Sequence, residues 1–128
     1  IRSFKVYRAA EMLLMRAEAK YRTGDATALV DLNQLRTNRG VTPGIETGTA
    51  LLDAILLTRR VELLGEGHRW FDIKRTTKTI VRAECGGGTS STSRARNCTI
   101  APTARGWVFP IPFNDMKVNP NLVQNNGY

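Results

Sequence analysis

The stretch that decides the fold is VYRAAEMLLMRAEAKYRTGDATALVDLNQLRTNRG, residues 6–40. Its first half places apolar residues three and four positions apart, which is the spacing of one face of an α-helix. Most charged residues fall off this face. The spacing predicts a helix from Val6 to Thr23, with a buried stripe made of Val6, Ala10, Leu13, Leu14, Ala17 and Tyr21.

A second helix is predicted directly after the first. Gly24 is a natural C-terminal stop, and Asp25 is well placed to cap the helix that follows. That helix is predicted from Ala26 to Asn38, and Gly40 ends it. Its expected buried face consists of Ala28, Leu32 and Leu35.

Two antiparallel helices joined by so short a turn form a helical hairpin, predicted over residues 1–40. Small residues alternate with large ones on the first helix, which suits close helix packing. This arrangement is typical of a tetratricopeptide unit. Because one such unit cannot bury both of its faces, we expect neighbouring units upstream.

A further helical region is predicted over residues 49–76. The residues before it, Val41 to Gly48, are rich in Gly and Pro and indicate a loop. A helix is expected from Thr49 to Leu64, and one or two more helical turns from Trp70 to Arg75. The expected buried residues of this region are Leu52, Ile55, Leu56, Leu63, Trp70 and Phe71.

Residues 77–106 form a predicted variable loop region. Gly86–Arg96 is poor in apolar residues and rich in Gly, Ser and Thr, which is typical of a mobile surface loop. The same stretch is a hairpin tip if Thr79–Ala83 and Cys98–Ala101 pair as strands. Both interpretations stay open. Residues 107–128 are rich in Pro and Asn, which few regular elements tolerate, and predict an extended tail packed over the helices.

Cys85 and Cys98 enclose the Gly- and Ser-rich stretch. They make a poor zinc site, which needs four ligands. A disulfide fits better: closing such a loop stabilises a fold by about 3 kcal/mol, and the bond persists only in an oxidising compartment. Two unrelated reduced cysteines are the alternative. The predicted fold is therefore mainly α, with a tetratricopeptide-like hairpin, a further helix, a disulfide-closed loop and an extended tail.

The composition limits the class of protein. At 128 residues and 41% hydrophobic, the chain supports one core. Its net charge of +8 raises the question of nucleic acid, but Arg and Lys are scattered rather than gathered into one stripe, and we expect no nucleic-acid partner. No apolar run approaches the roughly eighteen residues of a membrane span. Any signal peptide or lipid-attachment Cys is expected upstream.

Groups capable of catalysis concentrate in RRVELLGEGHRWFDIKR, residues 59–75. Two carboxylates and an imidazole at Glu66, His68 and Asp72 supply the groups of a hydrolase. Arginines at helical spacing from these acids favour instead an ion-pair network that fixes the join between the helix and the Trp70 turn. The predicted network consists of Arg60, Glu62, Glu66, His68, Arg69, Asp72 and Arg75.

No other segment indicates an enzyme. His68 is the only histidine, so a two-His metal site is excluded, and no nucleophile or phosphate-binding motif occurs. We expect no catalytic residues, metal or cofactor. Aromatic rings stack on sugars, but most aromatics here are expected in the core or as tail anchors. The candidate ligand-binding residues are Trp107, Arg94 and Arg96.

Ordered blocks across the chain resemble the SusD/RagB family. Residues 8–19 (RAAEMLLMRAEA) and 32–40 (LNQLRTNRG) resemble two successive helices of its C-terminal portion. Residues 59–75 resemble its strongest signature, and the ending from PIP at 110–112 to QNNGY at 124–128 resembles its closing motif.

The resemblance implies a helical fold with tetratricopeptide-like repeats, held at the outer-membrane surface of Bacteroidetes-type bacteria by a lipid anchor upstream. It implies binding of oligosaccharides or other nutrients and a SusC-like TonB-dependent transporter as partner, with this chain as scaffold and transporter-facing surface. The matched motifs are scaffold motifs, so no sugar-binding residue carries over, and the cysteine loop is not part of the pattern. The alternative is a tetratricopeptide-like protein-interaction domain without glycan binding.

Overall fold

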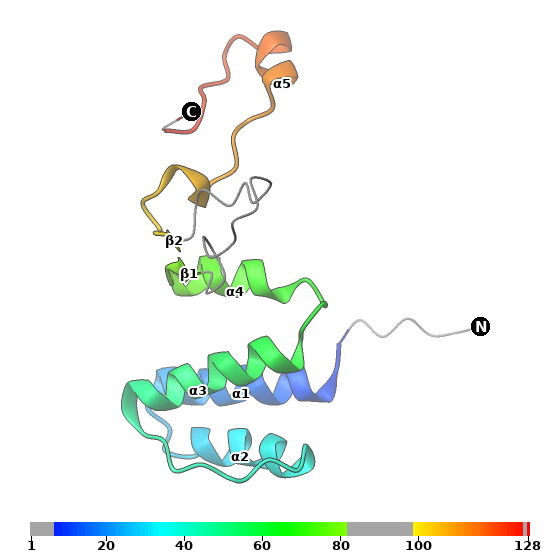
Figure 1. The fold of residues 1–128 in the computed structure, drawn as a ribbon, viewed down its shortest axis with the longest axis vertical. Coiled ribbons are helices and arrows are strands. Elements are labelled where there is room, and N and C mark those ends of the chain that lie inside the picture. Colours follow the sequence, from blue (N-terminus) through cyan, green and yellow to red (C-terminus); the bar gives the residue numbers. More distant parts are fainter. Residues whose placement is uncertain (1–6, 82–98, 127) are drawn as a thin grey trace, which may run out of the picture. The chain divides into compact units, whose positions relative to one another are not determined.

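The computed structural model describes residues 7–81, 99–126 and 128, and is mainly helical, as predicted (Figure 1). The chain divides into two compact units, Ile1–Asp72 and Ile73–Tyr128, and each is described by itself. In chain order the elements are α1 (Ala9–Thr23), α2 (Ala28–Asn38), α3 (Gly48–Glu62), α4 (His68–Thr76), β1 (Ile80–Val81), β2 (Thr99–Ile100), the 3-10 helix η1 (Arg105–Trp107) and α5 (Phe113–Val118). No helix in these described ranges is long and apolar enough to cross a membrane.

The first unit begins with α1, which ends where the sequence predicted. Gly24 follows the helix with a φ of 77°, a left-handed conformation that favours glycine over residues with a Cβ. Asp25 does not cap the next helix directly. Its Oδ1 accepts hydrogen bonds from the N–H and the hydroxyl of Thr27, both at 2.8 Å, and α2 begins at Ala28. Asp25 therefore shapes the turn before the helix rather than its first turn.

A buried carboxylate links α1 to α2. Asp31, on α2, is 2% exposed. Its oxygens accept hydrogen bonds from Nε and Nη2 of Arg16, both at 2.8 Å, and Lys20 Nζ lies 3.0 Å away. The hydrogen bonds from Arg16 are the main reason that the pKa of Asp31 is lowered. The two helices are thus held by polar contacts in addition to their apolar faces.

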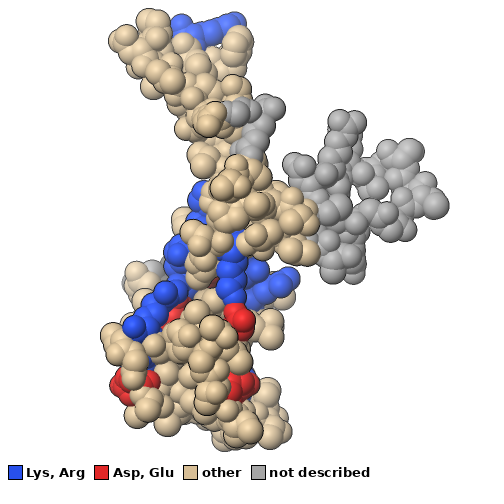
Figure 2. All heavy atoms as spheres, turned by 90° about the vertical axis from the view of Figure 1, so that its left-hand side faces the viewer, with Lys and Arg blue, Asp and Glu red and all other residues tan. Residues whose placement is uncertain are grey.

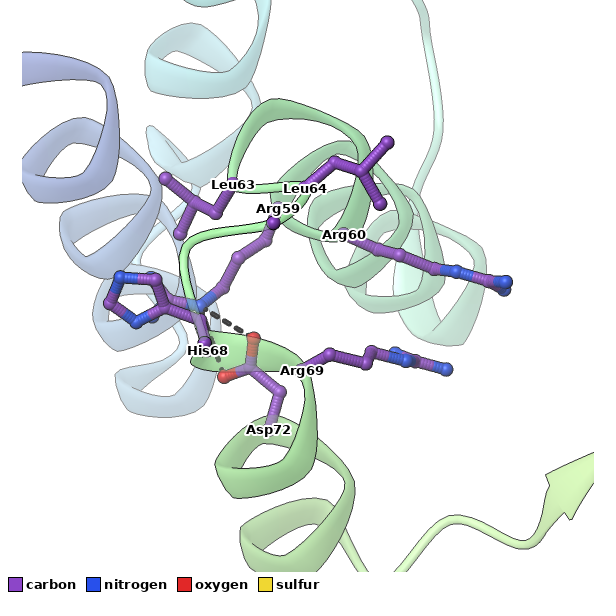
Figure 3. Close-up of a pocket in the computed structure, with 9 residues that line it drawn as sticks. Arg59, Arg60, Leu63, Leu64, His68, Arg69 and Asp72 are labelled. Carbon is purple, nitrogen blue, oxygen red and sulfur yellow. Dashed lines mark hydrogen bonds and ion pairs between the residues drawn. The ribbon is translucent and has the colours of Figure 1, made fainter.

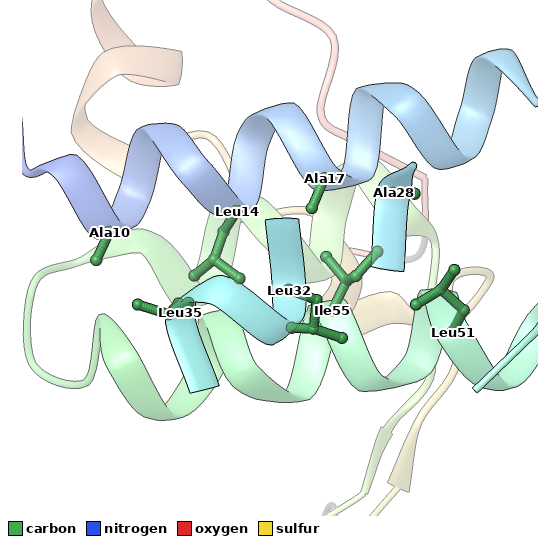
Figure 4. Close-up of a cluster of buried hydrophobic side chains, with 8 residues drawn as sticks. All are labelled: Ala10, Leu14, Ala17, Ala28, Leu32, Leu35, Leu51 and Ile55. Carbon is green, nitrogen blue, oxygen red and sulfur yellow. The ribbon is translucent and has the colours of Figure 1, made fainter. Parts of the chain in front are cut away.

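The core lies between α1, α2 and α3, which pack side by side (Figure 4). Leu14, Leu32 and Ile55 are fully buried, one from each helix. The expected position of Leu52 is corrected, because Leu51 enters the core and Leu52 is only half-buried. Leu51 and Ile55 are four residues apart and so share one helical face. The core cluster comprises Ala10, Leu14, Ala17, Ala28, Leu32, Leu35, Leu51 and Ile55.

Side chains of α2 hold the loop that precedes α3. The amide of Asn33 accepts a hydrogen bond from the N–H of Gly44 and donates one to its carbonyl, both at 2.8 Å. One helical turn on, Arg36 donates two hydrogen bonds to the carboxylate of Glu46, at 2.9 and 2.7 Å. This loop was predicted from its glycines and proline, whereas its attachment to α2 was not.

The Arg36–Glu46 contact predicts a pH dependence. Hydrogen bonds from Arg36 lower the pKa of Glu46 from 4.5 to about 2. Because the carboxyl binds protons more weakly in the folded chain, the stabilisation is complete above about pH 5 and is lost as the pH falls through the folded pKa. Urea denaturation of the Glu46→Gln variant is therefore expected to show a smaller loss of unfolding free energy between pH 5 and pH 2 than the parent chain. Parallel curves for the two chains would contradict this.

The helix α4 begins at His68 rather than at Trp70. Phe71 was predicted to be buried and is 70% exposed, while Trp70 is half-buried. The buried positions are the next two, Asp72 and Ile73. Successive residues of a helix project about 100° apart, so a face that buries these two residues turns Phe71 outward.

In the second unit, β1 and β2 pair antiparallel, with Ile80 opposite Ile100 and Val81 opposite Thr99. The strand pairing that the sequence left open is therefore formed. The end of the chain is not extended throughout, because it contains α5, which the sequence analysis missed. Pro112 stands directly before this helix, where a proline is tolerated.

Side chains near the C-terminus bind the backbone that precedes α5. Gln124 accepts a hydrogen bond from the N–H of Ile111 at 2.8 Å and donates one to its carbonyl at 3.0 Å. Asn125 donates to the carbonyl of Phe109 at 2.7 Å, and the Tyr128 hydroxyl donates to that of Val108 at 2.9 Å. The polar residues of the tail thus close it on itself.

Candidate functional site

The candidate site is built around a buried ion pair between α3 and α4. Nε of Arg59, in the last turn of α3, donates to both oxygens of Asp72 at 3.0 and 2.9 Å (Figure 3). The two residues are 7% and 6% exposed. An ion pair removed from water is stabilising only with good geometry, and removal of either partner leaves an uncompensated charge.

A third element reaches the same guanidinium. Glu11, on α1, is 4% exposed, and its carboxylate lies 3.5 Å from Nη2 of Arg59. The imidazole of His68 lies 3.6 Å from this carboxylate and 3.5 Å from Nη2, and it is charged only when protonated. Arg59 therefore connects α1, α3 and the start of α4.

A second ion-pair cluster lies at the C-terminal end of α3. Arg8 contacts Glu62 at 3.1 Å and Glu66 at 2.7 Å, and Arg39 contacts Glu62 at 2.6 Å. Hydrogen bonds from Arg39, and then from Arg8, hold the pKa of Glu62 below its usual range. This cluster ties the start of α1 and the end of α2 to α3.

These contacts correct the predicted network. Glu62, Glu66, His68 and Asp72 find partners, but Arg60 and Arg69 make no ion pair with any residue that the structure describes. Arg60 and Glu62 are two residues apart on α3 and so project from different faces of the helix. Arg75, the remaining predicted member, lies in the last turn of α4.

Most of the partners that the prediction missed come from elsewhere in the chain. Three of them lie far from residues 59–75 in sequence. The fourth, Arg59, lies inside that segment but was not included in the predicted network. These partners are Arg8, Glu11, Arg39 and Arg59. Arg8 and Glu11 belong to the first matched block and Arg39 to the second, which was the one sequence signal that linked them.

The three groups of the hydrolase hypothesis, Glu66, His68 and Asp72, do not form a catalytic arrangement in this geometry. Both oxygens of Asp72 accept from Arg59, and Glu66 is paired with Arg8. Glu66 does not line the cavity that His68 and Asp72 share. Among residues 7–81, 99–126 and 128, no group of three His, Cys, Asp or Glu side chains is placed to hold a metal ion.

A cavity of about 190 Å³ adjoins the Arg59–Asp72 pair. It lies between the C-terminal turn of α3 and the first turn of α4, and Figure 3 shows its main side chains. The lining residues are Arg59, Arg60, Leu63, Leu64, Gly65, Gly67, His68, Arg69 and Asp72.

The candidate ligand residues are placed as follows. Trp107 is 7% exposed; Lys74 Nζ lies 5.0 Å from its ring centre and donates a hydrogen bond to its carbonyl at 2.7 Å. So buried a ring offers little surface to a sugar, and this favours an anchoring role over ligand binding. Arg94, Arg96, Cys85 and Cys98 lie outside the described residues.

The ion pairs of the candidate site fall within the sequence blocks that resemble the SusD/RagB family. The sequence model of the SusD family matches residues 2–128. The chain belongs to the SusD family.

Two relatives in the SusD family cover nearly the whole chain. SusD-like protein P38 of Formosa agariphila is 34% identical over 96% of this chain and 24% of its own length. The starch-binding protein SusD of Bacteroides thetaiotaomicron is 34% identical over 96% of this chain and 21% of its own length. The chain thus spans under a quarter of the length of these relatives.

Solved structures of SusD-type proteins agree with the fold. A SusD superfamily protein from Parabacteroides distasonis superposes with a TM-score of 0.73 at 32% identity, over 98% of this chain and 27% of that chain. A SusD-like carbohydrate-binding protein from Bacteroides vulgatus gives a TM-score of 0.65 at 29% identity, over 91% and 29%.

Proposed function

We propose that this chain forms part of a cell-surface protein that binds glycans or other nutrients and delivers them to a SusC-like TonB-dependent outer-membrane transporter. The observation that carries the proposal is the family match over residues 2–128. One relative is named as starch-binding and one solved neighbour as carbohydrate-binding, and both align along nearly all of this chain.

Within such a protein, this chain supplies scaffold and transporter-facing surface rather than catalysis. The matched blocks contribute Arg8, Glu11, Arg39, Arg59 and Asp72, and each of these side chains forms an ion pair between elements. These ion pairs hold helices to one another, which supports a structural role for the charged groups. The protein is therefore proposed to bind its ligand without turning it over.

The cellular setting follows from the same proposal. We propose that the protein is held at the outer-membrane surface by a lipid anchor. A Cys85–Cys98 disulfide suits that oxidising location. The α1–α2 hairpin serves as one tetratricopeptide-like unit, and its packing against α3 is consistent with that role.

The experiment is a glycan array probed in parallel with the 128-residue chain and with the intact protein. We expect saturable binding by the intact protein and weaker or no binding to most glycans by the chain alone, because the chain contributes mainly scaffold. Absence of binding by the intact protein across neutral and acidic glycans would contradict the glycan-binding part of the proposal.

One observation favours protein interaction as the second candidate function. A groove of about 280 Å³ lies between the end of α2 and α3. Its lining includes Val41, Leu57 and Val61, which are 53%, 59% and 69% exposed. An apolar groove with charged edges suits a protein partner. The array separates the candidates, since an interaction domain binds no glycan.

A further inference from the structure

Another cavity, of about 320 Å³, lies at the end of the first unit where α1 stops and α3 begins. Its walls come from the last turn of α1, the start of α2 with the turn before it, and the residues that lead into α3. All of its lining residues belong to the first unit. Figure 2 looks onto this end of the unit, and acidic side chains reach the surface there.

The inner wall of this cavity is apolar. Ala28 and Leu51 line it, and both lie at one end of the core cluster in Figure 4. Tyr21 and Leu29 also line it, and both are half-buried and pack against that cluster. Aromatic and aliphatic surface of this kind accommodates the carbon–hydrogen face of a sugar ring. The wall therefore suits a ligand with an apolar face as well as polar groups.

Two carboxylates supply acceptors on the outer side of the cavity, and both are ionised at neutral pH. Hydrogen bonds from Thr27 are the main reason that the pKa of Asp25 is lowered, and hydrogen bonds from Arg36 lower that of Glu46 to about 2. Oδ2 of Asp25 accepts no hydrogen bond from a described residue. Because Arg36 offsets the charge of Glu46, one uncompensated carboxylate remains, which disfavours an anionic ligand without making a cation site.

Donors line the same cavity. The hydroxyl groups of Tyr21 and Thr47 have no hydrogen-bond partner among the described residues. Gly48 is the first residue of α3, and the N–H groups of a first helical turn have no acceptor within their own helix. Thr47, directly before it, makes no side-chain cap hydrogen bond to them. The cavity thus combines unused donors with a carboxylate oxygen that is free to accept.

We propose that this cavity binds one unit of a neutral saccharide. The inference rests on the proposed glycan-binding function and assigns it a site within this chain. A sugar hydroxyl both donates and accepts, so it uses both capacities when it donates to Asp25 and accepts from Tyr21 or from the N–H of Gly48. A volume of about 320 Å³ lies at the small end of the range of ligand sites, roughly 300–1,000 Å³, and suits about one sugar ring.

The test is an NMR titration of the isotope-labelled 128-residue chain with maltotriose, cellotriose, mannotriose and the acidic trigalacturonate. We expect at least one neutral trisaccharide to shift the amide signals of residues 21–29 and 46–51 saturably, with a dissociation constant in the roughly millimolar range. We expect trigalacturonate to bind about tenfold more weakly, because Asp25 repels its carboxylates.

The decisive variant is Tyr21→Phe combined with Asp25→Asn. The first change removes only a hydroxyl, and the second keeps an acceptor for Thr27 while placing an amide donor where Oδ2 accepts, so the fold should be kept, and circular dichroism checks this. The dissociation constant of the neutral trisaccharide is expected to rise about tenfold or more. The control is Tyr7→Phe combined with Asp115→Asn, which makes the same changes at exposed positions outside the cavity and should leave binding unchanged.

Four results would overturn the inference. They are no saturable shift with any neutral trisaccharide, shifts that map away from the lining residues, equally tight binding of trigalacturonate, and equal losses of binding in the double variant and its control. If the intact protein still binds glycans on the array, the proposed function stands and only this site fails. If the intact protein binds no glycan there, the proposed function itself fails.

Discussion

The Asp72→Ala variant is expected to lose about 3–5 kcal/mol of unfolding free energy. Asp72 is 6% exposed and accepts two hydrogen bonds from Nε of Arg59. Its removal leaves Arg59, which is 7% exposed, with Glu11 at 3.5 Å as the one nearby acid among the described residues. Urea denaturation followed by circular dichroism measures the loss as a fall in the transition midpoint at unchanged slope.

The matched control for this prediction is Arg60→Ala. Arg60 neighbours Arg59 on α3 but is exposed, and it makes no ion pair with a described residue, so the change should stay within about 0.5 kcal/mol. A His68→Ala, Asp72→Ala variant that keeps the parent stability would contradict the structural role. Such a variant would also restore the hydrolase hypothesis if an activity of the parent chain were lost with it.

The second large effect is expected from Leu14→Ala, at about 2–5 kcal/mol of unfolding free energy. Leu14 lies at the centre of α1 and is fully buried between α2 and α3 (Figure 4). Truncation removes apolar contacts with neighbours that are held by three helices and cannot collapse into the space. The same denaturation experiment measures the loss.

Leu57→Ala is the control, because it makes the same chemical change on the outer side of α3. Leu57 is 59% exposed, so the expected change is within about 0.5 kcal/mol. Equal losses for the two leucines would mean that the core does not lie where α1, α2 and α3 meet.

Local sequence patterns predicted the helical part of the fold well. The spacing of Ala10, Leu14 and Ala17 gave the buried face of α1, and Gly24 gave its end. Both signals depend only on residues within one or two turns of one another, so neighbouring elements do not alter them. The family was predicted from the ordered blocks and is confirmed by the match over residues 2–128.

The predictions of burial were wrong where either of two adjacent residues could have been the buried one. Leu51 and Leu52 have the same hydropathy, and only the rotation of α3 against its neighbours decides which one is buried. Phe71 is more apolar than Asp72, yet Asp72 is the buried residue because it forms an ion pair with the buried Arg59. The helix α5 was missed because its flanking prolines suggested an extended tail.

The sequence by itself determined that the segments of α1 to α4 are helical, where the first helix ends, and to which family the chain belongs. Only the tertiary structure decided which charges pair. Glu62 forms ion pairs with Arg8, 54 positions away, and with Arg39, 23 positions away, rather than with Arg60 on its own helix. The physical reason is that helical periodicity is a property of the local chain, whereas an ion pair needs two side chains within about 4 Å, and that distance is set by how whole helices pack.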